Sequence, residues 1–331
     1  EFYPPSLTRL QNPPLVLYVK GDESVLKNEL SISVVGARKA SDYGTAVARA
    51  LSSAMAELGF TVVSGGTLGI DSAAHTGALD VNGKTVCVLG CGLGTKYLMD
   101  NQPLRDKIAE NGAVITEFPP FSPAGKSTFP LRNRIISAIS LGTVVVEAGE
   151  RSGSLITARL ALEQGKDVFA VPGDLVSSSF LGTNNLIRNG ATPVFSPNDI
   201  LEAYFFKYFD LLGKKERFPD DEIIVRAQRY LTATESRAEE KTEAEVKTRK
   251  TKTAEATVGT VPEKPKKEPP SYLTENARLV YSLLSTEPIH IDEIINLSYI
   301  GTKETLSAVT ELEIYGLAVQ ISGRRYKVNT D

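Results

Sequence analysis

The sequence is poor in the residue types that build metal and redox sites. Its 331 residues include only two cysteines and two histidines. Cys87 falls in an expected strand and Cys91 just after it, with no histidine nearby in the sequence. We therefore expect no metal centre and no cofactor. Two cysteines in a chain of this length are typical of reduced thiols, which favours a cytoplasmic location.

Long apolar runs are also missing. The longest fairly apolar stretch without a charge is Ile135–Val146. That is far short of the ~20 residues that cross a bilayer. No apolar segment with basic flanks begins the sequence, so we expect neither a membrane span nor a secretory signal. A basic excess is absent too, because the net charge is −3. A nucleic-acid ligand would therefore need a local basic patch.

Between residues 31 and 196, short β-branched runs alternate with segments of helical length. This alternation predicts an α/β fold with a doubly wound, mostly parallel, Rossmann-like sheet that is covered by helices on both faces. Glycines at positions 59, 112 and 165 end three of the expected helices. The expected strands are Ser31–Val35, Thr61–Val63, Thr85–Leu89, Ala113–Thr116, Thr143–Val146 and Asp167–Val171, and the expected helices are Tyr43–Leu58, Asp71–Val81, Leu104–Asn111, Leu131–Ser140 and Leu155–Gln164.

Composition divides the chain into three parts. We expect residues 1–212 to form the Rossmann-like domain. Residues 213–271 are rich in Lys, Glu, Thr, Ala and Pro, so we expect a flexible charged linker, in which Asp220–Leu231 could hold a helix. Residues 272–331 show three amphipathic helices and a hairpin, a pattern typical of a small winged-helix domain.

The expected third helix of the winged-helix domain is acidic. It carries Glu304, Glu311 and Glu313 against the single Lys303. An acidic face repels phosphate, so we expect this domain to contact protein rather than to read DNA. Three cations on the wing, Arg324, Arg325 and Lys327, leave DNA binding by this domain open.

Glycine-rich loops follow the strands of the first domain. In a parallel sheet these loops meet at one edge, where ligands of doubly wound folds bind. Glycine lets backbone N–H groups approach an anion closely, so four such loops on one edge favour phosphate binding. The six loops begin Gly36-Ala37-Arg38, Ser64-Gly65-Gly66, Gly90-Cys91-Gly92, Glu117-Phe118-Pro119, Glu147-Ala148-Gly149 and Pro172-Gly173-Asp174.

The usual nucleotide cradles are missing from these loops. Gly90-Cys91-Gly92-Leu93-Gly94 superficially resembles a dinucleotide fingerprint, but no helix begins at its last glycine and no acidic residue follows at the ribose position. A Walker sequence is absent as well. NAD and ATP therefore both lack their usual cradle in this sequence.

A basic segment without acids suggests a different phosphate ligand. Residues 118–146 contain no acidic residue but hold Lys126, Arg132 and Arg134, with Phe129 between them. Cations that follow phosphates, beside a ring that stacks on a base, are what a single-strand binder needs. Phe129 lies between Thr128 and Pro130 in an expected loop, which favours its exposure. Arg132 and Arg134 cannot share a helix face, so one could instead pair with Glu117 or Glu147.

Further candidates complete the expected DNA-binding set. Arg38 follows Gly36 on the same edge, and Ser152-Gly153-Ser154 offers hydroxyl and N–H groups at a helix start. The full set is Gly36, Arg38, Ser64, Gly65, Gly66, Lys126, Phe129, Arg132, Asn133, Arg134, Ser152, Gly153 and Ser154.

In this order the motifs resemble the DNA-processing protein A family (DprA, also called Smf). The matching segments include Tyr3-Pro4, Val34-Val35-Gly36-Ala37-Arg38, Gly69-Ile70-Asp71, Phe129-Pro130-Leu131-Arg132-Asn133-Arg134, Ser152-Gly153-Ser154-Leu155-Ile156-Thr157-Ala158 and Gly182-Thr183-Asn184-Asn185-Leu186-Ile187. The resemblance covers residues 3–200, and the linker and winged helix also suit it. One departure is Tyr97-Leu98, where the family has Tyr-Pro.

The resemblance implies a bacterial cytoplasmic protein that binds incoming single-stranded DNA without sequence preference during natural transformation. Members of the family protect the strand, self-associate through the Rossmann-like domain, which implies a homodimer, and help to load the RecA recombinase. Carried onto this sequence, the DNA-contacting residues of the family are Arg38, Lys126 and the stacking Phe129.

An enzyme remains the alternative. His75, Asp71, Glu117 and Glu147 are candidates for acid–base work. Glu147 with Ser152-Gly153-Ser154 loosely resembles the ribosyl-phosphate site of nucleotide phosphoribohydrolases built on a similar core. Yet no serine or cysteine has a base at recognisable spacing. We favour non-catalytic binding, with His75 satisfied by a neighbouring residue and Asp71 capping a helix.

Overall fold

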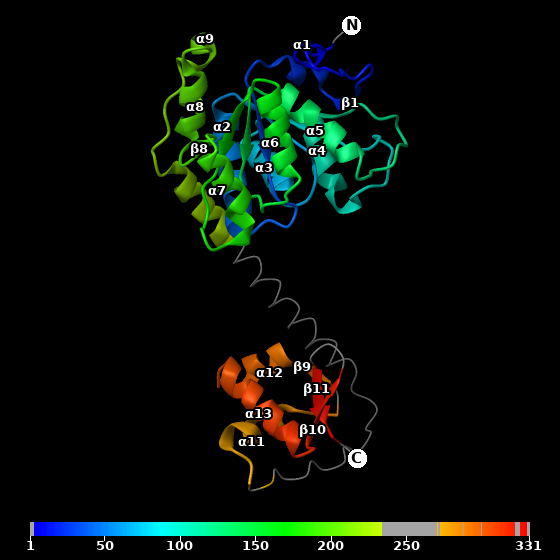
Figure 1. Cartoon of the computed structure of the whole chain (residues 1–331), viewed down its shortest axis with the longest axis vertical. Coiled ribbons are helices and arrows are strands. Elements are labelled where there is room, and N and C mark those ends of the chain that lie inside the picture. The colour runs from blue at the N-terminus through cyan, green and yellow to red at the C-terminus, as the bar shows by residue number, and fades with distance from the viewer. Residues whose placement is uncertain are drawn as a thin grey trace. The chain divides into compact units, whose positions relative to one another are not determined.

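The structure is a computed structural model, in which residues 3–233, 270, 272–286, 288–298, 300–321 and 325–329 are described. The chain divides into two compact units, Glu1–Arg249 and Lys250–Asp331. Figure 1 shows the first in blue through yellow-green and the second in orange to red.

An eight-stranded sheet forms the centre of the first unit, in the order β1-β5-β4-β3-β2-β6-β7-β8. Neighbours from β5 to β8 pair in parallel, and β1 pairs with β5 antiparallel. The strands are β1 Tyr18–Gly21, β2 Ser31–Val35, β3 Thr61–Ser64, β4 Thr85–Val88, β5 Ala113–Thr116, β6 Gly142–Val145, β7 Asp167–Ala170 and β8 Thr192–Pro193. The predicted mostly parallel, Rossmann-like sheet is confirmed. Strands β1 and β8 were not predicted from the sequence.

Helices cover both faces of this sheet, and β2 shows why. All five of its residues are buried. Ile32 and Val34 join the core beneath α2, α3 and α8, whereas Val35 joins the core beneath α5 and α6. Successive side chains of a strand point to opposite faces of the sheet. Because the side chains on both faces of β2 are buried, helices must pack against both faces. The helices are α1 Pro5–Thr8, α2 Asp42–Glu57, α3 Ile70–Asp80, α4 Gln102–Asn111, α5 Thr128–Ala138, α6 Ser154–Glu163, α7 Leu181–Arg188, α8 Pro197–Phe205 and α9 Phe209–Leu212, with 3₁₀ turns at Glu23–Lys27, Met99–Asn101 and Ser178–Phe180 (Figure 1).

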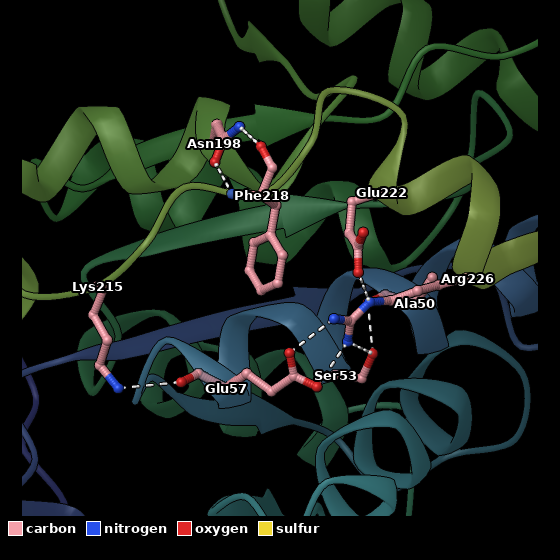
Figure 2. A network of polar contacts seen from close by, with 8 residues as sticks. All are labelled: Ala50, Ser53, Glu57, Asn198, Lys215, Phe218, Glu222 and Arg226. Carbon is pink, nitrogen blue, oxygen red and sulfur yellow. Dashed lines mark hydrogen bonds and ion pairs between the residues drawn. The ribbon is translucent and has the colours of Figure 1, made fainter.

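The segment after residue 212 belongs to the first unit, although the sequence analysis assigned it to the linker. A helix runs through residues 222–233, and Ile223 and Ala227 are buried in the core with α2. Figure 2 shows how polar contacts hold it: Arg226 donates to both carboxylate oxygens of Glu57, at 3.0 and 2.8 Å, and to Glu222. The expected start of the linker at residue 213 is therefore too early, because apolar side chains bury beyond it. The rest of the expected linker, 234–269 and 271, lies outside the described residues.

The second unit has the predicted winged-helix arrangement. Its helices are α11 Glu275–Leu283, α12 Ile291–Ser298 and α13 Thr302–Ile314. A sheet in the order β10-β11-β9 is built from Ile289–His290 (β9), Ala318–Ile321 (β10) and Arg325–Val328 (β11). The core gathers apolar residues of all three helices and the wing, among them Val280, Ile294, Leu312 and Tyr326.

Candidate nucleic-acid interface

A cavity of about 660 Å³ opens at the carboxyl ends of β2 and β6. These two strands are neighbours, but the chain continues from β2 to β3 on one side and from β6 to β7 on the other. Such a reversal of strand order leaves a crevice where ligands of open α/β sheets bind. The cavity therefore lies where the fold itself predicts a binding site.

The loop after β2 carries Arg38 into this cavity on a fixed backbone. The N–H of Ala37 donates to the carbonyl of Glu147 at 2.8 Å, and the N–H of Ile70 donates to the carbonyl of Ala37 at 3.1 Å. A Cβ on Gly36 would lie 2.5 Å from Cγ1 of Ile70, so only glycine fits there. Arg38 itself is exposed and lines the cavity, as does Gly36.

Glu147 holds the other end of this loop and is itself fully buried. Its carboxylate accepts from the N–H of Ser41 at 3.2 and 3.0 Å and from the Ser41 hydroxyl at 2.7 Å. Ser41 in turn caps α2 by accepting from the N–H of Gly44. This carboxylate positions the loop that bears Arg38, and that engagement weakens the enzyme interpretation.

The sequence predicted a loop at Phe129, but this residue lies in the first turn of α5. Pro130 is compatible with that position because the first N–H groups of a helix need no intrahelical partner. The Arg38 guanidinium carbon lies 4.5 Å from the centre of the half-buried Phe129 ring. Tyr97 packs against the same ring with 5.8 Å between centroids. Lys126 is exposed just before α5, so the structure brings Arg38, Lys126 and Phe129 to one cavity.

Arg132 also lines the cavity, but its side chain is almost wholly buried. It is 4% exposed, and its guanidinium donates to the carbonyls of Gly65 and Val88. Both carbonyls come from the ends of β3 and β4, so this side chain ties two strand ends together beneath the cavity. Its charge supports the site from within rather than facing solvent.

Arg134 is also engaged inside the domain. Its guanidinium pairs with Glu117, one of the two partners that the sequence left open, and only 16% of the Arg134 side chain is exposed. Burial raises the pKa of Glu117 above its ordinary value, and the nearby Arg134 opposes this shift. Arg134 does not line the cavity, so we do not expect it to contact DNA.

Ser64, Gly65 and Gly66 do not line the cavity either. The buried Ser64 hydroxyl donates to the carbonyl of Val34 at 2.6 Å, within the sheet. A Cβ on Gly65 would collide with the Arg132 guanidinium, which explains the glycine without any ligand. The glycines of this loop therefore allow close packing of neighbouring side chains and need not bind a phosphate.

The remaining sequence-predicted residues stay at the site. Ser152, Gly153, Ser154 and Asn133 all line the cavity. The hydroxyls of Ser152 and Ser154 lie 2.8 Å apart and bond to each other at the start of α6. Asn133 is 8% exposed, so little of it is available to a ligand.

The sequence analysis missed Lys39 and Arg151. Both are exposed and line the cavity, each in a loop after a strand. The signal was available, since Lys39 follows Arg38 directly and Arg151 precedes the predicted Ser152-Gly153-Ser154. Leu98, at the departure from the family pattern, has a φ of 46°, which proline could not adopt.

The acids of the cavity are turned away from a ligand. Asp71 and Glu147 line it, but both are buried. Asp71 lies in the first turn of α3, and its carboxylate accepts from the N–H and the hydroxyl of Thr67 at 3.2 and 2.8 Å. It is therefore not the capping residue that precedes α3, which is Gly69. The exposed charges around the cavity are positive.

His75 is fully buried in α3 and away from this cavity. The Thr85 hydroxyl donates its one proton to the carbonyl of Val62, so it must accept from Nδ1 of His75, 2.7 Å away. Burial lowers the pKa of His75 to about 3, and the charge of Arg132 adds to the shift. A neutral imidazole without solvent contact is unsuited to acid–base work. The expected neighbouring partner is Thr85, which bonds Nδ1, whereas the buried Nε2 has no hydrogen-bond partner among the described residues.

This histidine predicts a pH dependence of stability. Between its folded pKa of about 3 and its ordinary value near 6.5, only the unfolded chain binds the proton. The free energy of unfolding should therefore fall by about 1.4 kcal/mol for each pH unit below about 6.5. Urea unfolding near neutral pH and at mildly acidic pH should show this loss, and His75→Gln should remove it. An identical pH dependence in both proteins would contradict the prediction.

No group of three or more metal-ligating side chains occurs in the described part of the chain. Burial raises the pKa of the Cys87 thiol to about 12, and Cys91 is also buried.

Among the described helices, none has the length and apolar character to cross a membrane.

The described surface of the winged-helix unit carries both acidic and basic side chains. Lys303 and Glu304 are exposed on α13, but Glu311 is engaged: its carboxylate accepts from the N–H and hydroxyl of Thr274 and so fixes the start of α11. Arg325 on the wing is exposed and Lys327 is half-buried, while Arg324 lies outside the described residues. Contact with protein by this unit stays a prediction.

Comparisons with known proteins find matches to both units of the chain. The sequence model of the family "DNA recombination-mediator protein A" matches residues 1–205, and that of the "DprA winged helix domain" matches residues 264–324. The chain is 33% identical to the protein Smf of a Synechocystis species over 329 residues, which cover 98% of this chain and 77% of Smf.

Two solved structures resemble the first unit. The crystal structure of DNA processing protein A from Streptococcus pneumoniae matches with a TM-score of 0.57 and 40% identity, over 60% of this chain and 70% of that protein. DNA processing protein A from Helicobacter pylori, described for its single-stranded DNA binding mode, matches with a TM-score of 0.58 and 31% identity, over 63% of this chain and 95% of that protein. The family model spans more than half of the chain, and the chain therefore belongs to the DNA recombination-mediator protein A family.

Proposed function

We propose that the cavity at β2 and β6 binds single-stranded DNA without sequence preference. The observation that carries this proposal is the grouping of Arg38, Lys126 and the Phe129 ring in one cavity whose acids are buried and bonded. The two cations would neutralise phosphates while the ring stacks on a base. Neither contact reads a base edge, so the binding is independent of sequence.

Family membership supports the wider role. The related H. pylori protein is described for its binding of single-stranded DNA. We infer that this chain, too, binds and protects DNA during natural transformation and recombination, helps to load the RecA recombinase, and acts by binding rather than by catalysis. A single-strand protection assay with a nuclease and a strand-exchange assay with RecA test the two parts of this role separately.

Self-association through the first unit completes the proposal. Phe206, directly after α8, and Phe209, the first residue of α9, are 89% and 57% exposed, and Phe205 contacts both rings edge to face. Exposed aromatic groups of this kind mark protein contacts. We propose a homodimer that uses this face. Sedimentation of the whole chain and of a Phe206→Ser/Phe209→Ser variant tests it, and an unchanged dimer in the variant would place the contact elsewhere.

Salt should weaken the binding in a defined way. Two neutralised phosphates, one at each cation, predict a slope of roughly −1.4 for the logarithm of affinity against the logarithm of salt concentration. Fluorescence anisotropy with labelled oligo-dT measures this slope directly. Affinity that does not change with salt would contradict a phosphate-binding cavity.

Replacing Phe129 by alanine should remove the stacking contribution. We expect a loss of ~1–3 kcal/mol of binding free energy with oligo-dT, the range for one stacked base. Phe121→Ala is the matched control, because Phe121 is exposed but does not line the cavity. If both variants bind equally well, the ring does not stack on DNA.

A further inference from the structure

We infer that Lys39 and Arg151 form a second phosphate-binding pair, which extends the DNA path from the β2 side of the cavity to the β6 side. This inference rests on the proposed function and names two residues for the same cavity. Both side chains are exposed and both line the cavity. Within the described residues, neither takes part in an ion pair or a hydrogen bond that would hold its charge.

Backbone hydrogen bonds fix the loop that carries Arg151. The N–H of Ser152 donates to the carbonyl of Gly149 at 3.0 Å, and the N–H of Gly182 donates to the carbonyl of Ala148 at 2.8 Å. The neighbouring Glu150 is exposed but does not line the cavity. A fixed loop that presents an unpaired guanidinium beside a cavity costs little ordering on binding an anion.

Lys39 shares the rigid support of Arg38. The loop is held by the carbonyl and carboxylate of Glu147 on one side and by Ile70 on the other. Gly69, with a φ of 76°, packs under the carbonyls of Ala37 and Arg38, where a Cβ would lie 2.3 Å from the first of them. The ammonium group of Lys39 is therefore available to a ligand while its backbone stays in place.

The sheet sets the spacing of these groups. Phe129 packs against Gly90 at the end of β4, Lys39 follows β2, and Arg151 follows β6. In the order β4-β3-β2-β6, three strand intervals of about 4.8 Å separate the outer ends, or about 14 Å. At the rise of about 3.4 Å per nucleotide of a duplex strand, about four nucleotides cover this distance. One unpaired strand can therefore reach from the Phe129 ring to Arg151.

The test uses the whole chain with oligo-dT of about 16 nucleotides, the upper end of the site sizes of single-strand modules. The double variant Lys39→Gln/Arg151→Gln should have a salt slope shallower by about 1.4, because each lost phosphate contact removes about 0.7. Its affinity at moderate salt should fall about tenfold. Lys39→Arg/Arg151→Lys keeps both charges and should keep the slope.

Lys84→Gln/Arg159→Gln is the matched control for a general loss of positive charge, because it also removes two charges, and Lys84 is exposed and does not line the cavity. Arg159 lies on α6 close to Arg151 in sequence, is largely exposed, and does not line the cavity. If the control changes the slope as much as the double variant does, or if the double variant keeps the wild-type slope, the inference is wrong. If the wild-type chain does not bind oligo-dT at all, the proposed function itself fails.

Discussion

A chain that carries Arg38→Ala and Lys126→Ala together is expected to lose more than a hundredfold in affinity for oligo-dT and to remain folded. Both side chains are exposed, and neither supports the core. The interaction that the structure shows for the Arg38 guanidinium is its position over the Phe129 ring. Hydrogen bonds to a charged partner contribute about 1.5–3 kcal/mol each, so two of them predict about 3 kcal/mol or more.

Fluorescence anisotropy of labelled oligo-dT measures this loss, and circular dichroism confirms the fold. A double variant at Lys84 and Arg159, both exposed cations outside the cavity, controls for the change in net charge. We expect that control to bind close to the wild-type level. Normal binding by the Arg38→Ala/Lys126→Ala chain would exclude the cavity as the DNA site.

Replacing Arg132 by alanine should instead unfold the first unit or weaken it strongly. The substitution removes a buried charge that satisfies the carbonyls of Gly65 and Val88, and it leaves a void beneath Phe129. Buried unsatisfied groups and cavities are the usual causes of large losses. We expect the free energy of unfolding to fall by about 3–5 kcal/mol, from the void together with the two carbonyls left without a donor.

Urea unfolding of Arg132→Ala against the wild-type chain measures this loss. Arg159→Ala, which removes an exposed arginine, should cost less than about 0.5 kcal/mol. A stable Arg132→Ala protein with greatly reduced DNA affinity would reverse our assignment, because it would make Arg132 a direct phosphate contact.

The sheet and most helices were predictable because their signals are local. Buried β-branched runs bounded by glycine specify parallel strands, and the predicted β2 and β5 have the observed bounds. Strand β1 was missed because it is short, half exposed and without alternation. The helix of residues 222–233 was foreseen at Asp220–Leu231, but it was placed in the linker. No local pattern specifies that Ile223 and Ala227 are buried against α2.

The site was predictable in its location but not in the roles of its cations. Strand ends of a parallel sheet meet at one edge, which correctly brought Arg38, Lys126 and Phe129 together. Arg132 and Arg134 look equivalent in sequence, yet one lies beneath the cavity and the other pairs with Glu117. Arg132 points inward because it donates to the carbonyls of Gly65 and Val88 at the ends of β3 and β4. These acceptors lie far from Arg132 in the sequence, so the local pattern does not reveal them.

Photochemical cross-linking tests the central claim most directly. Oligo-dT that carries iodouracil bonds to aromatic side chains on which the base stacks, and mass spectrometry of the digested complex locates the linked peptide. Our account predicts a cross-link at Phe129 or at its neighbour Tyr97, in the first unit. Cross-links confined to the winged-helix unit, residues 272–329, with none at the cavity, would contradict it.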